Sequence, residues 1–222
     1  MYKKELFRYL DKKYNSHLYT GLLGFLMNQC HKKLENFSSN NKHFNKILEI
    51  GAGSAPHYSY IKHSYNEYHI AETSDYAEDF HKDNPKVKLI KYDGKKLPYE
   101  NQTFDRIIIS HCLEHILSPE EFIQEMMSKL NKGGILSISL PTDPGLAWRL
   151  GRLFIRFFTI KKTYNISGEE FNYMNATEHV NSIFNLISII RFNYKGKFKE
   201  DFYPLKLKMS DINLFYNVHI YK

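Results

Sequence analysis

The sequence predicts an α/β protein with a single domain, built on a doubly wound, mostly parallel seven-stranded sheet that ends in an antiparallel hairpin. Three observations predict this fold. Short aliphatic runs alternate with helical patterns from residue 46 to residue 140, which is typical of a parallel sheet with helices on both faces. Two glycines, Gly51 and Gly53, follow the first aliphatic run. The chain ends in two strand-like runs with no helical pattern between them.

The parallel part of the sheet is expected within residues 46–141. Strand-like runs stand at 46–50, 68–73, 87–92, 104–110 and 135–140. Between the last two, residues 119–131 carry the clearest helical pattern, with Pro119 in the expected first turn. Gly133 and Gly134 are expected to end that helix.

Three further segments surround this core. Residues 1–45 are predicted to form an N-terminal helical cap, because apolar residues recur at helical spacing over 3–37. Residues 142–178 fit no strand pattern. Since doubly wound folds bind ligands outside the carboxyl ends of their strands, this insertion is predicted to be a lid over the substrate. Residues 179–222 are expected to complete the domain with a helix near 180–191 and two strands joined by a turn near 209–211.

Composition limits the possible partners and the cellular compartment of the protein. The net charge of +7 permits an anionic partner without requiring nucleic acid. The apolar stretch 18–27 is interpreted as an amphipathic helix, since it has no cleavage-site pattern and is shorter than the roughly 18 residues of a membrane span. Cys30 and Cys112 are too few for a disulfide framework. A reducing compartment, the cytoplasm, is expected.

The glycine turn after the first strand is the first candidate for a binding site. Glycine lets the backbone come close to a ligand and adopt angles that a side chain would forbid, although a lone G-x-G also serves packing alone. Pro56 stands where a third glycine would complete the dinucleotide pattern G-x-G-x-x-G. The turn is therefore expected to bind a ligand without a pyrophosphate.

Three acidic residues are placed to contact the same ligand. Glu49 stands two residues before Gly51. Glu72 ends the second strand-like run, 21 residues after Gly51, and an acid about 20 residues beyond a glycine-rich turn suits the hydroxyls of a ribose. Asp93 ends the third run, where its carboxylate can accept a hydrogen bond from an adenine amine.

The stretches LEIGAG, YDGKKLPYENQTFDRIIISHCLEHI and LNKGGILSISLP, in this order and spacing, resemble the class I S-adenosylmethionine-dependent methyltransferases, and among them the type 11 small-molecule group. The resemblance covers residues 46–141. It implies a Rossmann-like fold, S-adenosylmethionine as cofactor and S-adenosylhomocysteine as product. The cofactor residues that it implies are Glu49, Gly51, Ala52 and Gly53 at the methionine end, Glu72 and Thr73 at the ribose, Asp93 and Gly94 at the adenine, and Ser110 and His111 on the sulfonium side.

Two positions depart from the pattern of these enzymes. Glu72 stands where aspartate is commoner, which is a conservative change. Ile70 stands where a small residue is usual, so the rim of the ribose site is the less certain part of the resemblance.

Methyl transfer to a hydroxyl benefits from a base, and histidine titrates in the right range. His179 is the first candidate, because it leaves the predicted lid beside Glu178, which could orient it. His115 is the second. For each histidine, including His57 after the glycine turn, the alternative is a structural, hydrogen-bonded role. His111 and His115 would share one face of a helix and could hold a metal ion. No third ligand is evident, so no metal is predicted.

The insertion is basic and rich in apolar residues. Arg149, Arg152 and Arg156 follow one another at helical spacing beside Trp148 and several leucines and phenylalanines. Three interpretations are open: a solvated face on a packed helix, a guanidinium cluster for a phosphorylated or nucleotide-linked acceptor, or an interfacial helix that touches anionic lipid. The candidates for substrate binding are the three arginines and Glu178.

The segment from PTDPGLAWRLGR to EHVNSIFNL resembles methyltransferases of bacterial surface-polysaccharide gene clusters. We therefore predict methyl transfer to an oxygen of a small anionic, sugar- or phosphate-containing precursor of a surface glycan, by a monomer or homodimer. Two alternatives stay open. One is a quinone- or lipid-type methyltransferase with peripheral membrane contact, and the other is a non-catalytic cofactor-binding partner subunit. A nucleic-acid substrate is disfavoured, since we find no appended RNA-binding module and no N/D-P-P-Y motif.

Overall fold

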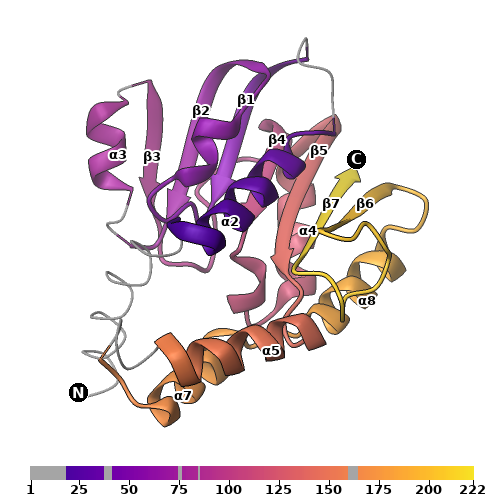
Figure 1. Ribbon diagram of the computed structural model, residues 1–222. Helices are drawn as coiled ribbons and strands as arrows, with labels where there is room; N and C mark the ends of the chain where they lie inside the picture. Colours follow the sequence, from indigo (N-terminus) through magenta and orange to yellow (C-terminus); the bar gives the residue numbers. More distant parts are fainter. Residues whose placement is uncertain (1–18, 38–41, 75–76, 85, 160–164) are drawn as a thin grey trace.

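The computed structural model describes residues 19–37, 42–74, 77–84, 86–159 and 165–222. A seven-stranded sheet with the order β3-β2-β1-β4-β5-β7-β6 forms its centre (Figure 1). Pairs are parallel from β3 to β5, and β7 runs antiparallel to both β5 and β6. This confirms the predicted fold class. The strands are β1 His43–Ile50, β2 Ser64–Glu72, β3 Val87–Lys91, β4 Phe104–Ser110, β5 Leu130–Pro141, β6 Phe198–Tyr203 and β7 Phe215–Tyr221.

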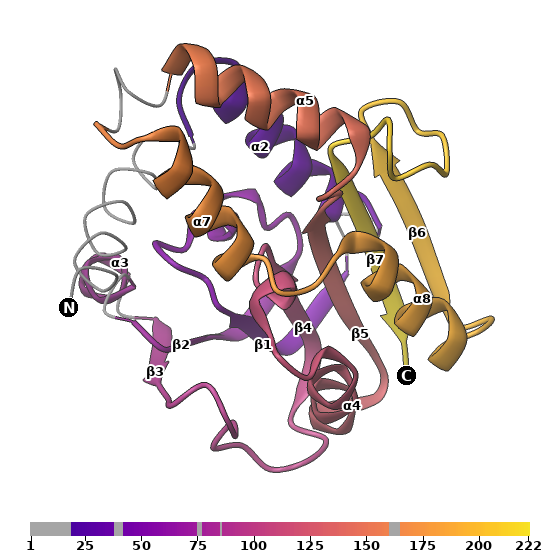
Figure 2. The ribbon, with the colours of Figure 1, turned by 90° about the horizontal axis from the view of Figure 1, so that it is seen from below.

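Helices cover both faces of the sheet and one of its ends. Helix α2 (Gly21–Leu34) lies on one face, and α4 (Pro119–Lys129) and α8 (Ile183–Asn193) lie on the other (Figure 2). The short α3 (Glu78–Asp83) stands beside β3. Helices α5 (Leu146–Phe154) and α7 (Gly168–Glu178) cross the end of the sheet where the parallel strands finish. The predicted insertion therefore lies where doubly wound folds bind ligands.

The central strands are aliphatic because both of their faces are covered. Ile47, Leu48 and Ile50 of β1 have no exposed surface, and residues 107–109 of β4 are equally buried. A strand buried on both faces needs a continuous apolar run rather than an alternating one, which is why these strands could be recognised in the sequence.

The boundary between α4 and β5 differs from the prediction. The helix expected over 119–131 ends at Lys129, and β5 begins at Leu130, which already pairs with Phe104 of β4. Gly133 and Gly134 thus lie inside β5 and do not end the helix. The register of β5 against β4 shifts between Phe104 and Arg106. Gly133 and Gly134 lie in this irregular part of β5.

The C-terminal hairpin is confirmed, but its connection is longer than the expected turn and spans residues 204–214. The side chain of Asn213 organises it. Its Oδ1 accepts the backbone N–H of Leu205 at 2.8 Å, and its Nδ2 donates to the carbonyls of Leu207 and Met209 at 2.8 and 2.9 Å. Residues 1–18 and 38–41 of the predicted cap lie outside the described residues; the described part contains α2, and β1 already begins at His43, inside the predicted cap.

A buried ion pair fixes α2 to the sheet. Glu35, directly after α2, accepts hydrogen bonds from Arg106 of β4 at 2.6 and 3.0 Å, and both side chains are fully buried. His57 Nε2 lies 3.0 Å from the same carboxylate, and the Arg106 guanidinium stands 4.5 Å over the ring of Phe37. Burial alone would raise the pKa of Glu35, but Arg106 and His57 outweigh it and hold that pKa well below its ordinary value.

We predict that Glu35→Gln lowers the free energy of unfolding by about 3–5 kcal/mol, because it leaves a buried guanidinium without its counter-charge. Urea denaturation at neutral pH measures this change. Glu67→Gln is the matched control, since the partly exposed carboxylate of Glu67 pairs with Lys46, His69 and the exposed Lys88, and ion pairs at the surface contribute about 0–1 kcal/mol. Equal losses in both variants would contradict a special role for the Glu35–Arg106 pair.

Candidate functional site

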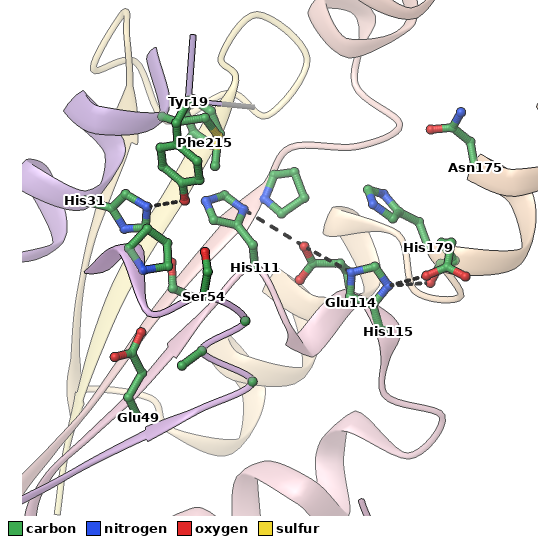
Figure 3. Close-up of a pocket in the computed structure, with 18 of the residues that line it drawn as sticks. Tyr19, His31, Glu49, Ser54, His111, Glu114, His115, Asn175, His179 and Phe215 are labelled. Carbon is green, nitrogen blue, oxygen red and sulfur yellow. Dashed lines mark hydrogen bonds and ion pairs between the residues drawn. The ribbon is translucent and has the colours of Figure 1, made fainter. Parts of the chain in front are cut away.

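A cavity of about 270 Å³ lies at the carboxyl end of the sheet, between α2, α5, α7 and the ends of β1 and β4 (Figure 3). Many of the predicted site residues line it, namely Glu49, Gly51, Ala52, Gly53, Ser110, His111, His115, Glu178 and His179. The other predicted residues do not line it, namely Glu72, Thr73, Asp93, Gly94, Arg149, Arg152 and Arg156. The predicted site residues thus divide into one group that lines the cavity and another that does not.

The turn after β1 requires its two glycines. Gly51 and Gly53 have φ angles of 63° and 55°, in the left-handed region that side chains disfavour. A Cβ atom on Gly51 would also lie 2.5 Å from the Sγ atom of Cys112. The backbone of β1 therefore turns directly under the cavity, with the chain after β4 packed against it.

Glu72, at the end of β2, ties this turn to its neighbour strand. Its Oε2 accepts the N–H of Gly53 at 2.8 Å, and its Oε1 accepts the N–H groups of Thr73 and Ser74 at 2.7 and 3.1 Å. The side chain is buried beside the cavity rather than on its wall. Gly94 lies next to Thr73, whose Cγ2 would be 3.4 Å from a Cβ atom added to Gly94. Asp93 is exposed and accepts the N–H of Lys95 at 3.0 Å.

Glu49 places a carboxylate at the wall of the cavity. It is buried, and its Oε2 accepts the hydroxyl hydrogen of Tyr68 at 2.6 Å. Burial raises the pKa of Glu49, and the nearby His57 partly opposes the rise. A cationic group in the cavity would favour the charged form of this carboxyl group. The position therefore suits a ligand that carries an ammonium group.

His111 does not share a helical face with His115, so that expectation was wrong. The 3₁₀ turn η2 spans only Leu113–His115, and His111 has a φ angle of 52°. Its Nε2 lies 3.7 Å from the Sγ of Cys30 in α2. Burial lowers the pKa of His111 to about 3, which makes it a neutral side chain in the cavity wall.

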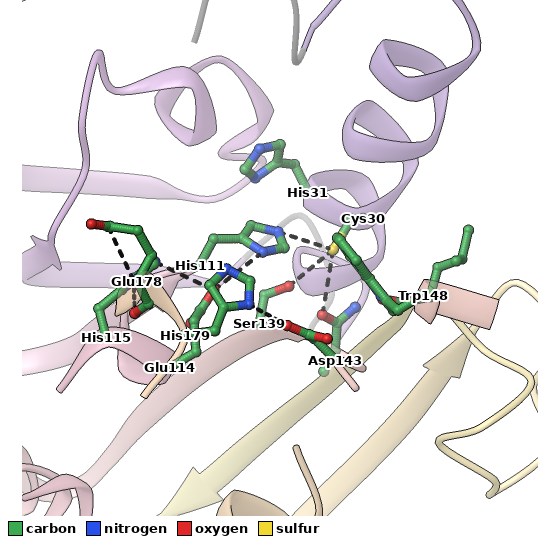
Figure 4. Close-up of polar contacts among 12 residues, drawn as sticks. Cys30, His31, His111, Glu114, His115, Ser139, Asp143, Trp148, Glu178 and His179 are labelled. Atoms are coloured by element: carbon green, nitrogen blue, oxygen red, sulfur yellow. Dashed lines mark hydrogen bonds and ion pairs between the residues drawn. The ribbon is translucent and has the colours of Figure 1, made fainter. Parts of the chain in front are cut away.

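His179 is oriented by Asp143, not by the predicted Glu178. The Nδ1 atom of His179 lies 2.6 Å from Oδ2 of Asp143, and Arg152 donates to the same oxygen (Figure 4). Glu178 instead offers its backbone carbonyl, which accepts the Nδ1 hydrogen of His115 at 2.7 Å. Asp143 follows β5 in a segment with no helical or strand pattern, so sequence spacing could not pair it with His179.

Sequence reasoning missed several other residues of the cavity. Glu114 is buried, and burial raises its pKa to about 7. His31 comes from α2, and Tyr19 stands two residues before that helix; the Tyr19 hydroxyl lies 2.8 Å from His31 Nε2. His57 is fully buried behind them, 3.0 Å from His31, which is the structural role weighed for it. The remaining lining residues are Met27, Ser54, Pro56, Pro141, Trp148, Met174, Asn175 and Phe215.

Arginines 149, 152 and 156 do not form one cluster. Only Arg152 is connected to the cavity wall, because it pairs with the carboxylate of Asp143, which also contacts His179. Arg149 is exposed on α5. Arg156 packs across the start of α7, where a Cβ on Gly168 would meet its Nε at 2.7 Å.

Known structures share this architecture. A possible histamine N-methyltransferase from Thermotoga maritima aligns over 97 % of this chain and 99 % of its own, with a TM-score of 0.62 and 18 % identity. The plantazolicin methyltransferase BpumL, in complex with a triazolic desmethylPZN analog and SAH, aligns over 97 % of this chain and 90 % of its own, at 0.64 and 15 %. The [4+2]-cyclase SpnF aligns over 88 % and 80 %, at 0.59 and 11 %. At identities this low, the alignments show that the folds are shared and nothing more.

The family comparison is more specific. Residues 22–191 match the family described as a methyltransferase domain, whereas curated proteins give no significant match to the chain. The match covers the glycine turn, Glu72 and the segment from β4 into α8. The chain belongs to this methyltransferase family and is an enzyme of the class I methyltransferase fold.

Proposed function

We propose that this enzyme methylates an oxygen of a small anionic acceptor, a sugar- or phosphate-containing precursor of a bacterial surface glycan. S-adenosylmethionine is the cofactor of this methyltransferase. The observation that carries the choice of acceptor is the group formed by Asp143, Arg152 and His179, of which His179 lines the cavity. The choice of a glycan precursor rests on the sequence likeness of residues 141–186 alone.

The chain's residues suit the cofactor at the glycine turn. When bound, the cofactor supplies an electrophilic methyl group on a sulfonium. The buried carboxylate of Glu49 suits its ammonium group, and Glu72 has an acceptor position left on Oε2 for a ribose hydroxyl. The buried Oγ of Ser110 has no hydrogen-bond partner among the described residues and lines the cavity. Thr73 is proposed for the ribose beside Glu72, and Asp93 and Gly94 for the outer, adenine end.

His115 and His179 serve the acceptor. Each donates its Nδ1 hydrogen to an oxygen, so each keeps the lone pair on Nε2. An acceptor hydroxyl loses its proton as its oxygen forms the bond to the methyl carbon. We place this step at the Nε2 atoms of His115 and His179, whose lone pairs can accept the proton. The predicted insertion, which contains α5 and α7, would exclude water and align the acceptor.

Arg152 supports an anionic acceptor. Its Nε is buried and, among the described residues, has no hydrogen-bond partner, while Nη2 donates to Asp143. A buried N–H group of a guanidinium without an acceptor is costly, and a phosphate or carboxylate oxygen from the acceptor would satisfy it.

We predict that Arg152→Gln weakens the enzyme selectively toward anionic acceptors. The assay would screen nucleotide sugars and phosphorylated sugars with a labelled methyl donor, and compare kcat/KM of the variant with that of the wild type. A charge-assisted hydrogen bond contributes about 1.5–3 kcal/mol, so a loss of roughly 10- to 150-fold is expected. Arg191→Gln, an exposed arginine of α8 paired with Glu200, is the control. Methylation of only neutral acceptors by the wild type would contradict the proposal.

A second candidate, a methyltransferase acting at a membrane surface, is favoured by the outer face of α5. Among the described residues no helix has the length and apolar character to cross a bilayer. The 204–214 connection meets the start of α5, where Ala147 donates its N–H to the carbonyl of Asp211 at 2.8 Å. Exposed apolar side chains gather on these two segments: Leu146, Leu150, Leu153, Phe154, Leu205, Leu207 and Met209. Arg149, Lys206 and Lys208 are exposed among them, which suits anionic lipid.

Vesicle sedimentation tests this second candidate. We predict that the protein sediments with vesicles that contain anionic lipid more than with neutral ones, and that Phe154→Glu releases it, because the glutamate replaces a side chain that is 62 % exposed and would insert into the interface. Phe192→Glu, on α8 and 87 % exposed, is the control. Equal sedimentation of the wild type and the Phe154 variant would rule out this face of α5 as the membrane contact.

A further inference from the structure

The acceptor end of the cavity holds three metal-ligating side chains that come from separate segments. Glu114 and His115 belong to η2, directly after β4, and His179 follows the last residue of α7 (Figure 4). One ligand atom from each lies within 4.8 Å of those of the other two. The two imidazole rings have centroids 5.2 Å apart and planes at 79°.

Both histidines are held as metal ligands usually are. His115 donates its Nδ1 hydrogen to the carbonyl oxygen of Glu178 at 2.7 Å, and His179 donates its own to the carboxylate of Asp143 at 2.6 Å. A histidine that binds a metal through one nitrogen almost always donates the other N–H to an oxygen, which fixes the tautomer and the ring orientation. In both residues Nε2 therefore carries the free lone pair.

Glu114 supplies an independent observation. Its side chain is only 4 % exposed, and its Oε2 has no hydrogen-bond partner among the described residues. Its Oε1 lies 3.9 Å from Nε2 of His115 and 4.0 Å from Nδ1 of His111, too far for hydrogen bonds. A buried carboxylate oxygen without a partner carries a large desolvation cost, which a cation would offset.

We propose that Glu114, His115 and His179 bind a divalent first-row transition cation at the acceptor end of the cavity. Two imidazoles and one carboxylate suit Zn²⁺ or Mn²⁺, whereas Mg²⁺ prefers oxygen ligands. Metal–ligand bonds of about 2.0–2.2 Å place ligand atoms about 3.3 Å apart in a tetrahedral site, so the three side chains close by about an ångström when the cation enters. Three protein ligands leave a position open toward the cavity. The sequence pattern suggested the pair His111 and His115, but the fold instead brings Glu114 and His179 to His115.

This inference rests on the proposed function and deepens it, since the cation would bind the acceptor oxygen. A hydroxyl bound to such a cation loses its proton more readily. The proton passes to solvent water, and a lone pair of the oxygen forms the bond to the methyl carbon. The electron pair of the breaking carbon–sulfur bond stays on sulfur, so no oxidant or reductant is needed. In this arrangement His115 and His179 are ligands rather than bases.

Calorimetric titration tests the site. Tag-free protein, stripped with a chelator and dialysed, is titrated with MnCl₂, ZnCl₂ and MgCl₂ in the absence of cofactor. We expect one equivalent of Mn²⁺ or Zn²⁺ per chain and much weaker binding of Mg²⁺. Glu114→Gln, His115→Ala and His179→Gln should each weaken binding at least about tenfold. His43→Ala is the control, because His43 is an exposed histidine that contacts Ser64 outside the cavity.

Three variants keep the test decisive if one of them fails to fold. The inference is overturned if the wild type binds neither Mn²⁺ nor Zn²⁺ at one equivalent, or if the folded ligand variants bind as tightly as the wild type. Titration of the same metal-free samples with S-adenosylhomocysteine separates the two proposals. A chain that binds this product but no cation retains the proposed function and loses the metal site. A chain that binds the cation but not the product retains the site and loses the proposed function.

Discussion

The hydrogen bonds of Glu72 are the constraint on which the active end of the sheet depends. Its carboxylate accepts the N–H of Gly53 on one oxygen and those of Thr73 and Ser74 on the other, so it joins the turn after β1 to the end of β2. A turn with three residues in the left-handed region, Gly51, Gly53 and Ala55, needs such ties to keep one conformation. With the turn fixed, Glu49 presents its carboxylate to the cavity, and Gly51 lies close enough to Cys112 to leave no room for a side chain.

The wall of the cavity formed by α2 and Tyr19 depends on a buried ion pair and a chain of hydrogen bonds. Glu35 and Arg106 hold α2 on the sheet, and hydrogen bonds continue from Glu35 through His57 and His31 to the hydroxyl of Tyr19 in the cavity wall. Burial lowers the pKa of His31 to about 2, with a further contribution from His57. His31 is therefore neutral and can pass a hydrogen bond along without adding a charge. Buried networks of this kind fix one arrangement because any missing partner is costly.

The sequence was informative wherever a local pattern has a physical cause. Continuous aliphatic runs marked the strands because both faces of the sheet are covered, and Gly51 was recognisable because its position excludes a side chain. Pairings between distant segments had no such signal. Nothing near Glu35 pointed to Arg106. The neighbouring Glu178 was predicted to orient His179, whereas Asp143, from the other end of the insertion, does so. His111 and His115 have helical spacing, but the left-handed backbone at His111 separates them. The ligand set that includes Glu114 likewise appears only when η2 and α7 meet.

The central claim, that the glycine turn and Glu72 form the cofactor site of this methyltransferase, is tested most directly by calorimetric titration with S-adenosylhomocysteine. The wild type should bind it with micromolar affinity. Glu72→Ala should lose that binding or weaken it strongly, whereas Glu67→Ala, on the same strand and outside the cavity, should bind as the wild type does. Absence of binding heat and of thermal stabilisation in the wild type, or equal affinity in the Glu72 variant, would contradict the account.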